Sequence, residues 1–176
     1  MPTPIPMTEP PLTVRRAQDT DLALLASYGF ALGRLHVGFD GERFATPPGG
    51  ESAYAEFFRA EMQRPEVVVL IAELGPQPVG YAFVRMEPMS LVEIRMAGAW
   101  LHDIYVDPEA RRGGIGRVLL EAAKQEALRL GSSSLMLSAS PHNHRAQALF
   151  ASAGLRPTMV EMRIELAQPL QQDCLT

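Results

Sequence analysis

The segment Arg111-Arg112-Gly113-Gly114-Ile115-Gly116 lies between an apolar run, Leu101 to Val106, and a stretch from Arg117 to Leu130 with apolar residues at helical spacing. A strand that leads through a glycine-rich turn into a helix creates an anion site, because backbone N–H groups and the helix dipole point at one place. This segment therefore predicts a ligand that carries phosphate.

Two well-known phosphate loops do not match this turn. A P-loop has Lys followed by Ser or Thr after its last glycine, whereas Arg117 and Val118 follow Gly116 here. A dinucleotide-binding turn has glycines spaced G-x-G-x-x-G, which this segment lacks. A plain turn whose glycines only allow unusual backbone angles stays an alternative, so the neighbouring sequence has to decide.

The composition is that of an ordinary globular domain. The chain has 176 residues, 47% hydrophobic and 20% charged, which is enough for one domain with a sizeable core. A net charge of −4 argues against a nucleic-acid partner. The single cysteine, Cys174, allows neither an intramolecular disulfide nor a cysteine metal cluster, so we expect a cytoplasmic protein without a metal.

The two ends of the chain differ from its middle. Residues 1–11 are rich in proline and lack the features of a signal peptide, so they are expected to form a flexible arm. Residues 12–166 are predicted to form a single domain, and residues 167–176 a C-terminal tail. No apolar run approaches the roughly 18 residues that span a bilayer, so no membrane contact is expected.

Hydrophobic periodicity predicts a mixed α/β fold. Its largely antiparallel sheet contains one parallel strand–helix–strand crossover over residues 99–138, with about four helices around it. The last strand is predicted from strict alternation and closes the sheet. In chain order the expected elements are a strand at 12–15, a helix capped by Asp19 to about Leu35, an irregular loop at 36–52, a helix at 52–64, strands at 67–72, 79–86 and 99–106, a helix ending at Gly131, a strand at 135–138, a helix at 143–153 and a strand at 160–166.

Two motifs at a fixed separation resemble the GNAT superfamily of acyl-CoA-dependent N-acetyltransferases. The first is Arg111-x-x-Gly114-x-Gly116 after a strand that ends in Val106, and the second is Asn143-x-x-Ala146 followed by Leu149-Phe150 and Gly154-Leu155. Together they are far more specific than either alone. The resemblance covers about residues 12–166 and is strongest from 99 to 155.

The resemblance implies a site for acetyl-CoA. Amides at the start of the helix would accept the pyrophosphate, and backbone groups of the preceding strand would pair with the pantetheine arm as an added strand does. Asn143 would bind the same arm, although a helix N-cap role is an equal alternative. The expected cofactor-binding residues are Ile104, Tyr105, Val106, Arg111, Arg112, Gly113, Gly114, Ile115, Gly116, Arg117, Asn143 and Phe150.

The resemblance also places the catalytic base on this strand. The matching positions are His102 and Asp103. Successive strand residues face opposite sides, so only one of the two is expected to face the substrate. His102 is narrowly favoured because a histidine titrates near neutral pH, while Asp103 or a water molecule is the alternative. Purely structural roles for His102 and Asp103 are an equal alternative.

One residue departs from the family pattern. Phe150 stands where the family commonly has a tyrosine that protonates the departing thiolate. A non-catalytic acyl-CoA sensor or interaction module therefore stays an alternative to an enzyme that acetylates a primary amine of a small molecule or peptide. A homodimer is common in the family, but the sequence indicates no interface. Four residues of the 36–52 loop are candidate acceptor contacts: Phe39, Asp40, Arg43 and Phe44. A purely structural role for this loop is an equal alternative.

Overall fold

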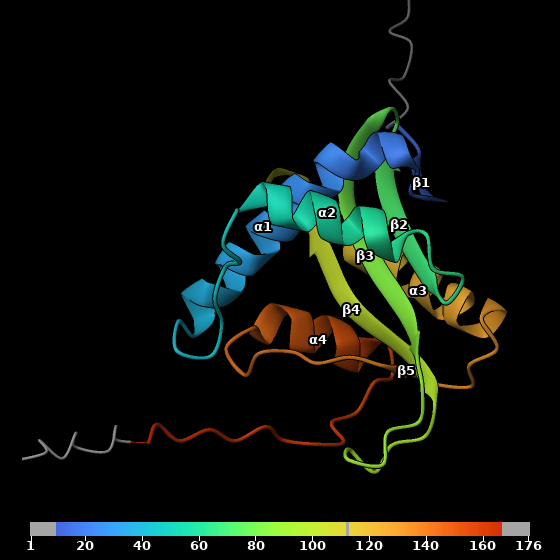
Figure 1. Ribbon diagram of the computed structural model, residues 1–176. Helices are drawn as coiled ribbons and strands as arrows, with labels where there is room; N and C mark the ends of the chain where they lie inside the picture. The colour runs from blue at the N-terminus through green and yellow to red at the C-terminus, as the bar shows by residue number, and fades with distance from the viewer. Residues whose placement is uncertain (1–9, 112, 167–176) are drawn as a thin grey trace, which may run out of the picture.

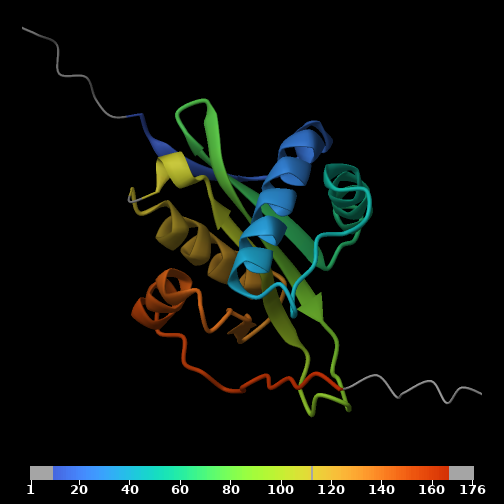
Figure 2. The same cartoon turned by 90° about the vertical axis from the view of Figure 1, so that its left-hand side faces the viewer.

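A computed structural model describes residues 10–111 and 113–166. A five-stranded sheet lies between two helical layers, with α1 and α2 on one face and α3 on the other (Figures 1 and 2). The elements are β1 (Leu12–Arg16), α1 (Leu22–Phe39), α2 (Glu51–Glu61), β2 (Val67–Leu74), β3 (Gln77–Glu87), β4 (Gly98–Val106), α3 (Ile115–Arg129), β5 (Leu135–Met136) and α4 (His144–Ser152). Short 3-10 turns precede α1 at Asp19–Asp21 and follow β4 at Pro108–Ala110.

The sheet order is β1-β2-β3-β4-β5, and every neighbouring pair is antiparallel except β4 and β5. The predicted class, a largely antiparallel sheet with one parallel crossover, is confirmed. The parallel pair is short, because only Ala99–Leu135 and Trp100–Met136 are in register. Beyond them β4 runs on to Val106 with no described strand on its β5 side, so the two strands diverge (Figure 1).

The core has two halves, one on each face of the sheet. Strand β2 contributes to both, because Val68 and Leu70 pack toward α3 while Val69 and Ile71 pack toward α1 and α2. This explains its uninterrupted apolar sequence, which a strand covered on both faces requires. The half below α1 and α2 is rich in aromatic side chains, namely Tyr28, Phe58, Tyr81, Phe83 and Tyr105.

Strand β4 contains a β-bulge. Phe83 pairs with Asp103 and the next residue of β3, Val84, pairs with Leu101, so His102 has no partner across the pair. An extra residue of this kind bends the strand and redirects the side chains around it. The expected alternation at 102 and 103 is therefore wrong, and both side chains face the α1–α2 side of the sheet.

Several predicted boundaries shift. Helix α1 continues to Phe39, so the irregular loop is residues 40–50, and the residue preceding α1 is Asp21 instead of Asp19. Helix α2 starts at Glu51 and ends at Glu61, ahead of Pro65. Strand β5 has two residues instead of four, since the chain departs from β4 after Met136.

Helix α1 bears on the membrane expectation. The helical stretch Asp19–Phe39 is long and apolar enough to cross a membrane by length and composition alone. However, Leu25 is fully buried and Tyr28 and Leu32 are 8% exposed, all in the core half below α1. These contacts are those of a core helix.

The prediction that residues 160–166 close the sheet is wrong. Residues 155–166 contain neither helix nor strand, and the segment runs along the lower margin of the molecule (Figure 1). Its alternating apolar side chains are 79–90% exposed: Val160, Met162, Ile164 and Leu166. An ion pair between Glu161 and Arg43 joins the segment to the loop between α1 and α2.

Candidate active site

The glycine-rich turn has the backbone that an anion site needs. Gly114 lies at the N-cap of α3 with φ of 75°, a left-handed conformation that favours glycine. The first amides of a helix have no partner within it, so those of Ile115 and Gly116 are suited to bind an anion. The side chain of Arg111 donates from Nε to the Val106 carbonyl (3.1 Å), which fixes the turn against the end of β4. Arg112 lies outside the described residues.

The second motif packs against the first. A Cβ on Gly116 would lie 3.2 Å from Leu149 of α4, so glycine permits close contact between the two helices. Arg117 donates from its guanidinium to Ser152 of α4 (3.0 Å). Asn143 accepts a hydrogen bond from the Ala146 amide (3.1 Å), which confirms its N-cap role and leaves the ligand role a prediction. Phe150 is 7% exposed and packs in the core beside α3.

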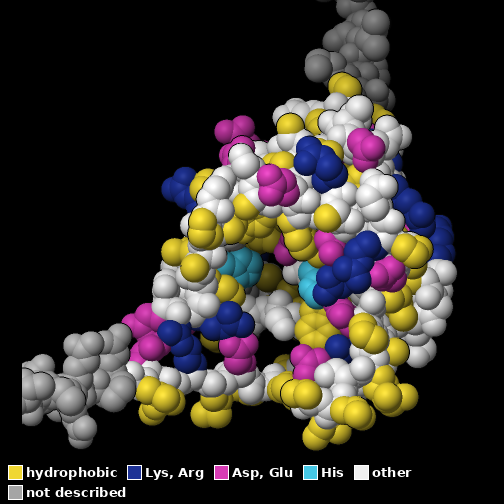
Figure 3. All heavy atoms as spheres, in the orientation of Figure 1, with side chains coloured by type: hydrophobic (Ala, Val, Ile, Leu, Met, Phe, Trp, Pro, Cys, Tyr) yellow, Lys and Arg dark blue, Asp and Glu magenta, His cyan; other side chains and the backbone are white. Residues whose placement is uncertain are grey.

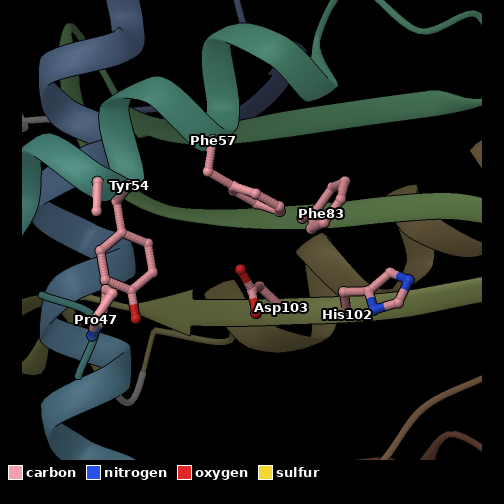
Figure 4. Close-up of a pocket in the computed structure, with 7 residues that line it drawn as sticks. Pro47, Tyr54, Phe57, Phe83, His102 and Asp103 are labelled. Carbon is pink, nitrogen blue, oxygen red and sulfur yellow. The ribbon is translucent and has the colours of Figure 1, made fainter. Parts of the chain in front are cut away.

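A pocket of about 400 Å³ opens on the α1–α2 face of the sheet. We call it the Asp103 pocket. In Figure 4 the Asp103 carboxylate points up from β4 into the space between Tyr54, Phe57 and Phe83. The space-filling view shows a hollow in the same face, with histidine side chains at its margin (Figure 3). The lining residues are Pro47, Ala53, Tyr54, Phe57, Phe83, His102 and Asp103.

Asp103 is held by one described hydrogen bond, which Tyr81 donates from its hydroxyl (2.9 Å). Burial raises the pKa of the Asp103 carboxyl, and the Tyr81 bond opposes this rise. Burial also holds the pKa of the Tyr81 hydroxyl well above its ordinary value, so that hydroxyl stays a donor. No cation contacts Asp103 among the described residues, so the carboxylate is available to a ligand in the pocket.

His102 makes both a polar and an aromatic contact with its neighbours, whereas Asp103 makes one hydrogen bond. Its Nε2 lies 2.8 Å from Glu87 Oε1, and its ring stacks on Phe83 at 5.2 Å. Burial alone would raise the pKa of Glu87, but hydrogen bonds from Arg85 and His102 hold it below its ordinary value. His102 therefore forms part of a charged group at the rim, whereas Asp103 faces the interior of the pocket.

The four predicted acceptor contacts lie elsewhere. His36 packs against Phe39 and Phe44, with ring centroids 5.9 and 5.0 Å apart. Arg43 lies over the Phe44 ring and pairs with Glu161, while Asp40 accepts hydrogen bonds from backbone amides of its own turn. None of the four lines the Asp103 pocket, to which this loop contributes Pro47.

Tyr54 and Phe57 lie within the helix predicted at 52–64, and neither is among the predicted site residues. The structure places both over Asp103, while Phe58 beside them is fully buried in the core. The available signal was an aromatic pair at i and i+3, which puts two rings on one helical face. Phe83 and Tyr81 lie in an uninterrupted apolar strand, so their sequence gives no sign of a site.

The fold and the paired glycine and asparagine motifs define an acyl-CoA-dependent acetyltransferase architecture. The chain belongs to the acetyltransferase (GNAT) family, whose sequence profile matches residues 38–155. The expected family is thereby confirmed.

One relative resembles the chain in sequence, and two solved structures share its fold. The chain is 33% identical over 100 residues to the uncharacterized N-acetyltransferase YhfO of Bacillus subtilis, a match that covers 56% of this chain and 64% of the relative. Among solved structures, a mutant of the BH1408 protein from Bacillus halodurans superposes with a TM-score of 0.77 at 23% identity, covering 88% of this chain and 99% of that one. The aminoglycoside N-acetyltransferase AAC(6')-Iy, solved with CoA, gives 0.74 at 16% identity, covering 92% and 98%.

Proposed function

We propose that this protein transfers the acetyl group of acetyl-CoA to a primary amine bound in the Asp103 pocket. The observation that carries the proposal is the Asp103 carboxylate, which faces the pocket and has no cationic partner among the described residues. Asp103 lies on β4, and in the described chain the edge of β4 on the β5 side is open beyond Trp100. The amine would approach β4 from the Asp103 pocket, and acetyl-CoA would approach it from the open edge.

The open part of β4 and the start of α3 suit the two halves of coenzyme A. The pyrophosphate would lie at the amides of Gly113 to Gly116, where the helix dipole favours negative charge. The pantetheine arm would run beside Ile104 to Val106 and pair with backbone groups as an added strand does. The Val106 carbonyl already accepts from Arg111, so the arm would use the remaining groups of this edge.

The chemistry requires a neutral amine. An amine with a pKa near 10.4 is neutral in only roughly 1 molecule in 2,500 at pH 7, which adds about 4.6 kcal/mol to the barrier. Asp103 accepts a proton from the ammonium, and the raised pKa of this carboxyl makes it a stronger base than an exposed aspartate. This revises the narrow preference for His102.

The amine nitrogen then attacks the thioester carbonyl, and the C–S bond breaks. Of the two protons that the nitrogen loses, one passes through Asp103 to water and the other neutralises the thiolate. Because Phe150 has no hydroxyl and is buried in the core, we propose that solvent carries this second proton from the nitrogen to the thiolate. A thiol with a pKa near 8.5 is a fair leaving group without an enzymatic acid.

The charges around the pocket favour an acceptor with one amine. The nearby carboxylates of Glu61 and Glu87 are paired, Glu61 with Arg64 and Arg85, and Glu87 with Arg85 and His102. Asp103 is thus the one pocket carboxylate free to face an ammonium among the described residues. A polyamine or aminoglycoside would leave further positive charges among apolar rings without partners.

The pocket lining favours an acceptor that has an apolar group next to its amine. The rings of Tyr54, Phe57 and Phe83 offer both apolar area and negative faces for an ammonium. We therefore assign the acceptor to arylalkyl or alkyl monoamines. A peptide with an apolar N-terminal residue also supplies a primary amine beside an apolar group.

The test measures thiol release from acetyl-CoA with four acceptors: an arylalkylamine, a peptide with an apolar N-terminus, a polyamine and an aminoglycoside. We expect the first two to give acetylated product by mass spectrometry and the largest kcat/KM. An equal or larger kcat/KM for the polyamine would overturn the acceptor class and leave acetyl transfer standing. Binding of coenzyme A without thiol release from any amine would support the acyl-CoA sensor, which Phe150 favours.

The single cysteine also leads us to propose a cytoplasmic location, since nothing in the sequence depends on an oxidising compartment. Fractionation of cells that express the tagged chain tests this.

A further inference from the structure

The wall of the Asp103 pocket nearest α1 is formed by Tyr54 of α2. Its ring lies lengthwise over two glycines of α1, Gly29 and Gly33, which stand at i and i+4 and therefore share one face of the helix. In Figure 4 the ring stands beside the blue ribbon of α1, with the Asp103 carboxylate on its other side. Tyr54 thus separates α1 from the space in which we place the acceptor.

The two glycines allow this position because neither carries a side chain. A Cβ on Gly33 would lie 2.5 Å from the Tyr54 hydroxyl oxygen, and a Cβ on Gly29 would lie 2.7 Å from the ring atom Cδ1. Heavy atoms in favourable contact are about 3.5–4.0 Å apart, so a side chain at either position would displace the ring by about 1 Å. Neither glycine has a positive φ, so the close approach of the ring is what requires glycine here.

The pocket is the open side of the Tyr54 ring. Phe30 of α1 packs edge-on against this ring, with centroids 6.4 Å apart. Phe58 is fully buried beside the ring, since its Cε2 atom would lie 3.1 Å from a Cβ on Gly29. The backbone of α1 closes a third side. A ring pushed away from Gly33 therefore moves into the pocket and narrows it.

Packing holds the Tyr54 ring in place. Its hydroxyl makes no hydrogen bond to any residue in the described part of the chain, so no polar contact fixes the end of the side chain. Burial and the nearby Asp103 charge raise the pKa of this hydroxyl, which keeps it neutral. The position of the pocket wall thus depends on the contact between the ring and α1.

We propose that Gly33 sets the width of the Asp103 pocket, because it lets the Tyr54 ring lie against α1, and that it thereby determines how large an acceptor the pocket admits. This inference rests on the proposed function, since it takes the pocket as the acceptor site. Gly33 is a positioning residue that acts through Tyr54. Gly29 does the same for the inner part of the ring, but it is buried beside Phe58, so a substitution there would also disturb the core.

The first test compares a narrow and a broad acceptor, butylamine and 2-phenylethylamine, with acetyl-CoA as donor. In Gly33→Ala we expect kcat/KM for 2-phenylethylamine to fall about 10-fold relative to kcat/KM for butylamine, chiefly through KM, with KM for acetyl-CoA unchanged. Gly38→Ala is the matched control, because it lies in the same helix and its Cβ would meet nothing within 4 Å. It should keep the wild-type ratio. An unchanged ratio in Gly33→Ala would overturn the inference.

The second test removes the atom that the new methyl group would meet. In Tyr54→Phe the nearest ring atom, Cζ, would lie 3.5 Å from a Cβ at position 33, which is ordinary contact. Adding Gly33→Ala to Tyr54→Phe should therefore leave the acceptor ratio of Tyr54→Phe unchanged. A loss of equal size in both backgrounds would show that Gly33 does not act through the Tyr54 hydroxyl, and would also overturn the inference.

The third test uses urea unfolding and needs no reaction. Alanine is a better helix former than glycine, so Gly38→Ala should not lower the urea midpoint. Gly33→Ala should lower the midpoint when Tyr54 is present and should not lower it in Tyr54→Phe, which measures the coupling of the two positions. This pattern, with no acetyl transfer from the wild type to any amine, would count against the proposed function and support the positioning of Tyr54 by Gly33. Equal shifts in both backgrounds would contradict that positioning.

Discussion

The Tyr81 hydroxyl donates a 2.9 Å hydrogen bond to Oδ2 of Asp103, and this bond joins the fully buried centre of β3 to the interior of the pocket on β4. Burial and this bond change the pKa of the carboxyl in opposite directions. Burial and the Tyr81 hydrogen bond together therefore determine the base strength of the Asp103 carboxylate.

Asp103→Asn removes the proposed base and keeps the shape of the side chain. We expect kcat to fall by about 10²- to 10⁴-fold, the usual contribution of general base catalysis. The carboxyl has a raised pKa in the folded state, so its effect on stability is most favourable below its unfolded pKa and is lost as pH rises through the folded pKa. At neutral pH the variant should thus unfold at no lower temperature than the wild type.

The control for this change is the neighbouring residue. His102→Asn should lower kcat less than 10-fold. Its pH–rate profile should still show the ionisation that is absent from the profile of Asp103→Asn. Loss of that ionisation in His102→Asn, with full activity in Asp103→Asn, would return the role of base to the histidine.

Tyr81→Phe removes the hydroxyl and leaves the ring in place. The lost hydrogen bond had lowered the pKa of Asp103, so that pKa should rise further. We expect the acidic limb of the kcat/KM profile to move to higher pH, with little change in the plateau rate. An unmoved limb would mean that Tyr81 does not act through Asp103.

Gly114→Glu tests the anion turn by adding negative charge. A Cβ there has open space, but its φ of 75° strains any side chain, and Gly114→Ala supplies the same strain without charge. Calorimetry should show coenzyme A binding lost in the glutamate variant and weakened less in the alanine variant. Equal affinities in both variants would remove the pyrophosphate from this turn.

Phe57→Ala tests the apolar acceptor. Phe57 lines the pocket and is 40% exposed, so its loss removes contact with the acceptor at little cost to the core. We expect KM for an arylalkylamine to rise about 10-fold, or about 1.4 kcal/mol, with KM for acetyl-CoA unchanged. Val118→Ala, on the exposed side of α3, is the matched control, and an identical effect of both changes would contradict the pocket assignment.

Asp21→Asn tests the ion pair that joins β1 to the start of α1. Arg15 donates two hydrogen bonds to Asp21, at 2.7 and 2.9 Å, and they lower the pKa of this carboxyl. We expect a loss of about 1–3 kcal/mol in the free energy of unfolding at pH 7, measured with urea. A lowered pKa stabilises the fold above the unfolded value and stops doing so as pH falls through the folded value, so the difference should shrink below about pH 4. A difference that persists at low pH would exclude the charge as its source.

The local order of elements could be predicted because hydrophobic period and turn residues act over short distances. The glycine turn, the Asn143 cap and the doubly buried β2 all follow from nearby residues. The strand at 160–166 was predicted wrongly because alternation shows that a segment suits a sheet and does not show which sheet edge it meets. The pocket could not be predicted because Tyr54, Phe83 and Asp103 come from three separate elements that only the tertiary fold brings together.

The β-bulge at His102 makes this position an insertion within an otherwise regular strand. Since His102 opposes no residue of β3, its exchange leaves the backbone pairing of the two strands intact and removes only its side-chain contacts with Glu87 and Phe83. Under the proposed function, a substitution at this one position would change the rim of the acceptor pocket while the sheet pairing is preserved. Deletion of this one residue would remove the bulge while the other β4 side chains keep their partners and their faces, so the extra residue serves to bend the strand beside the pocket.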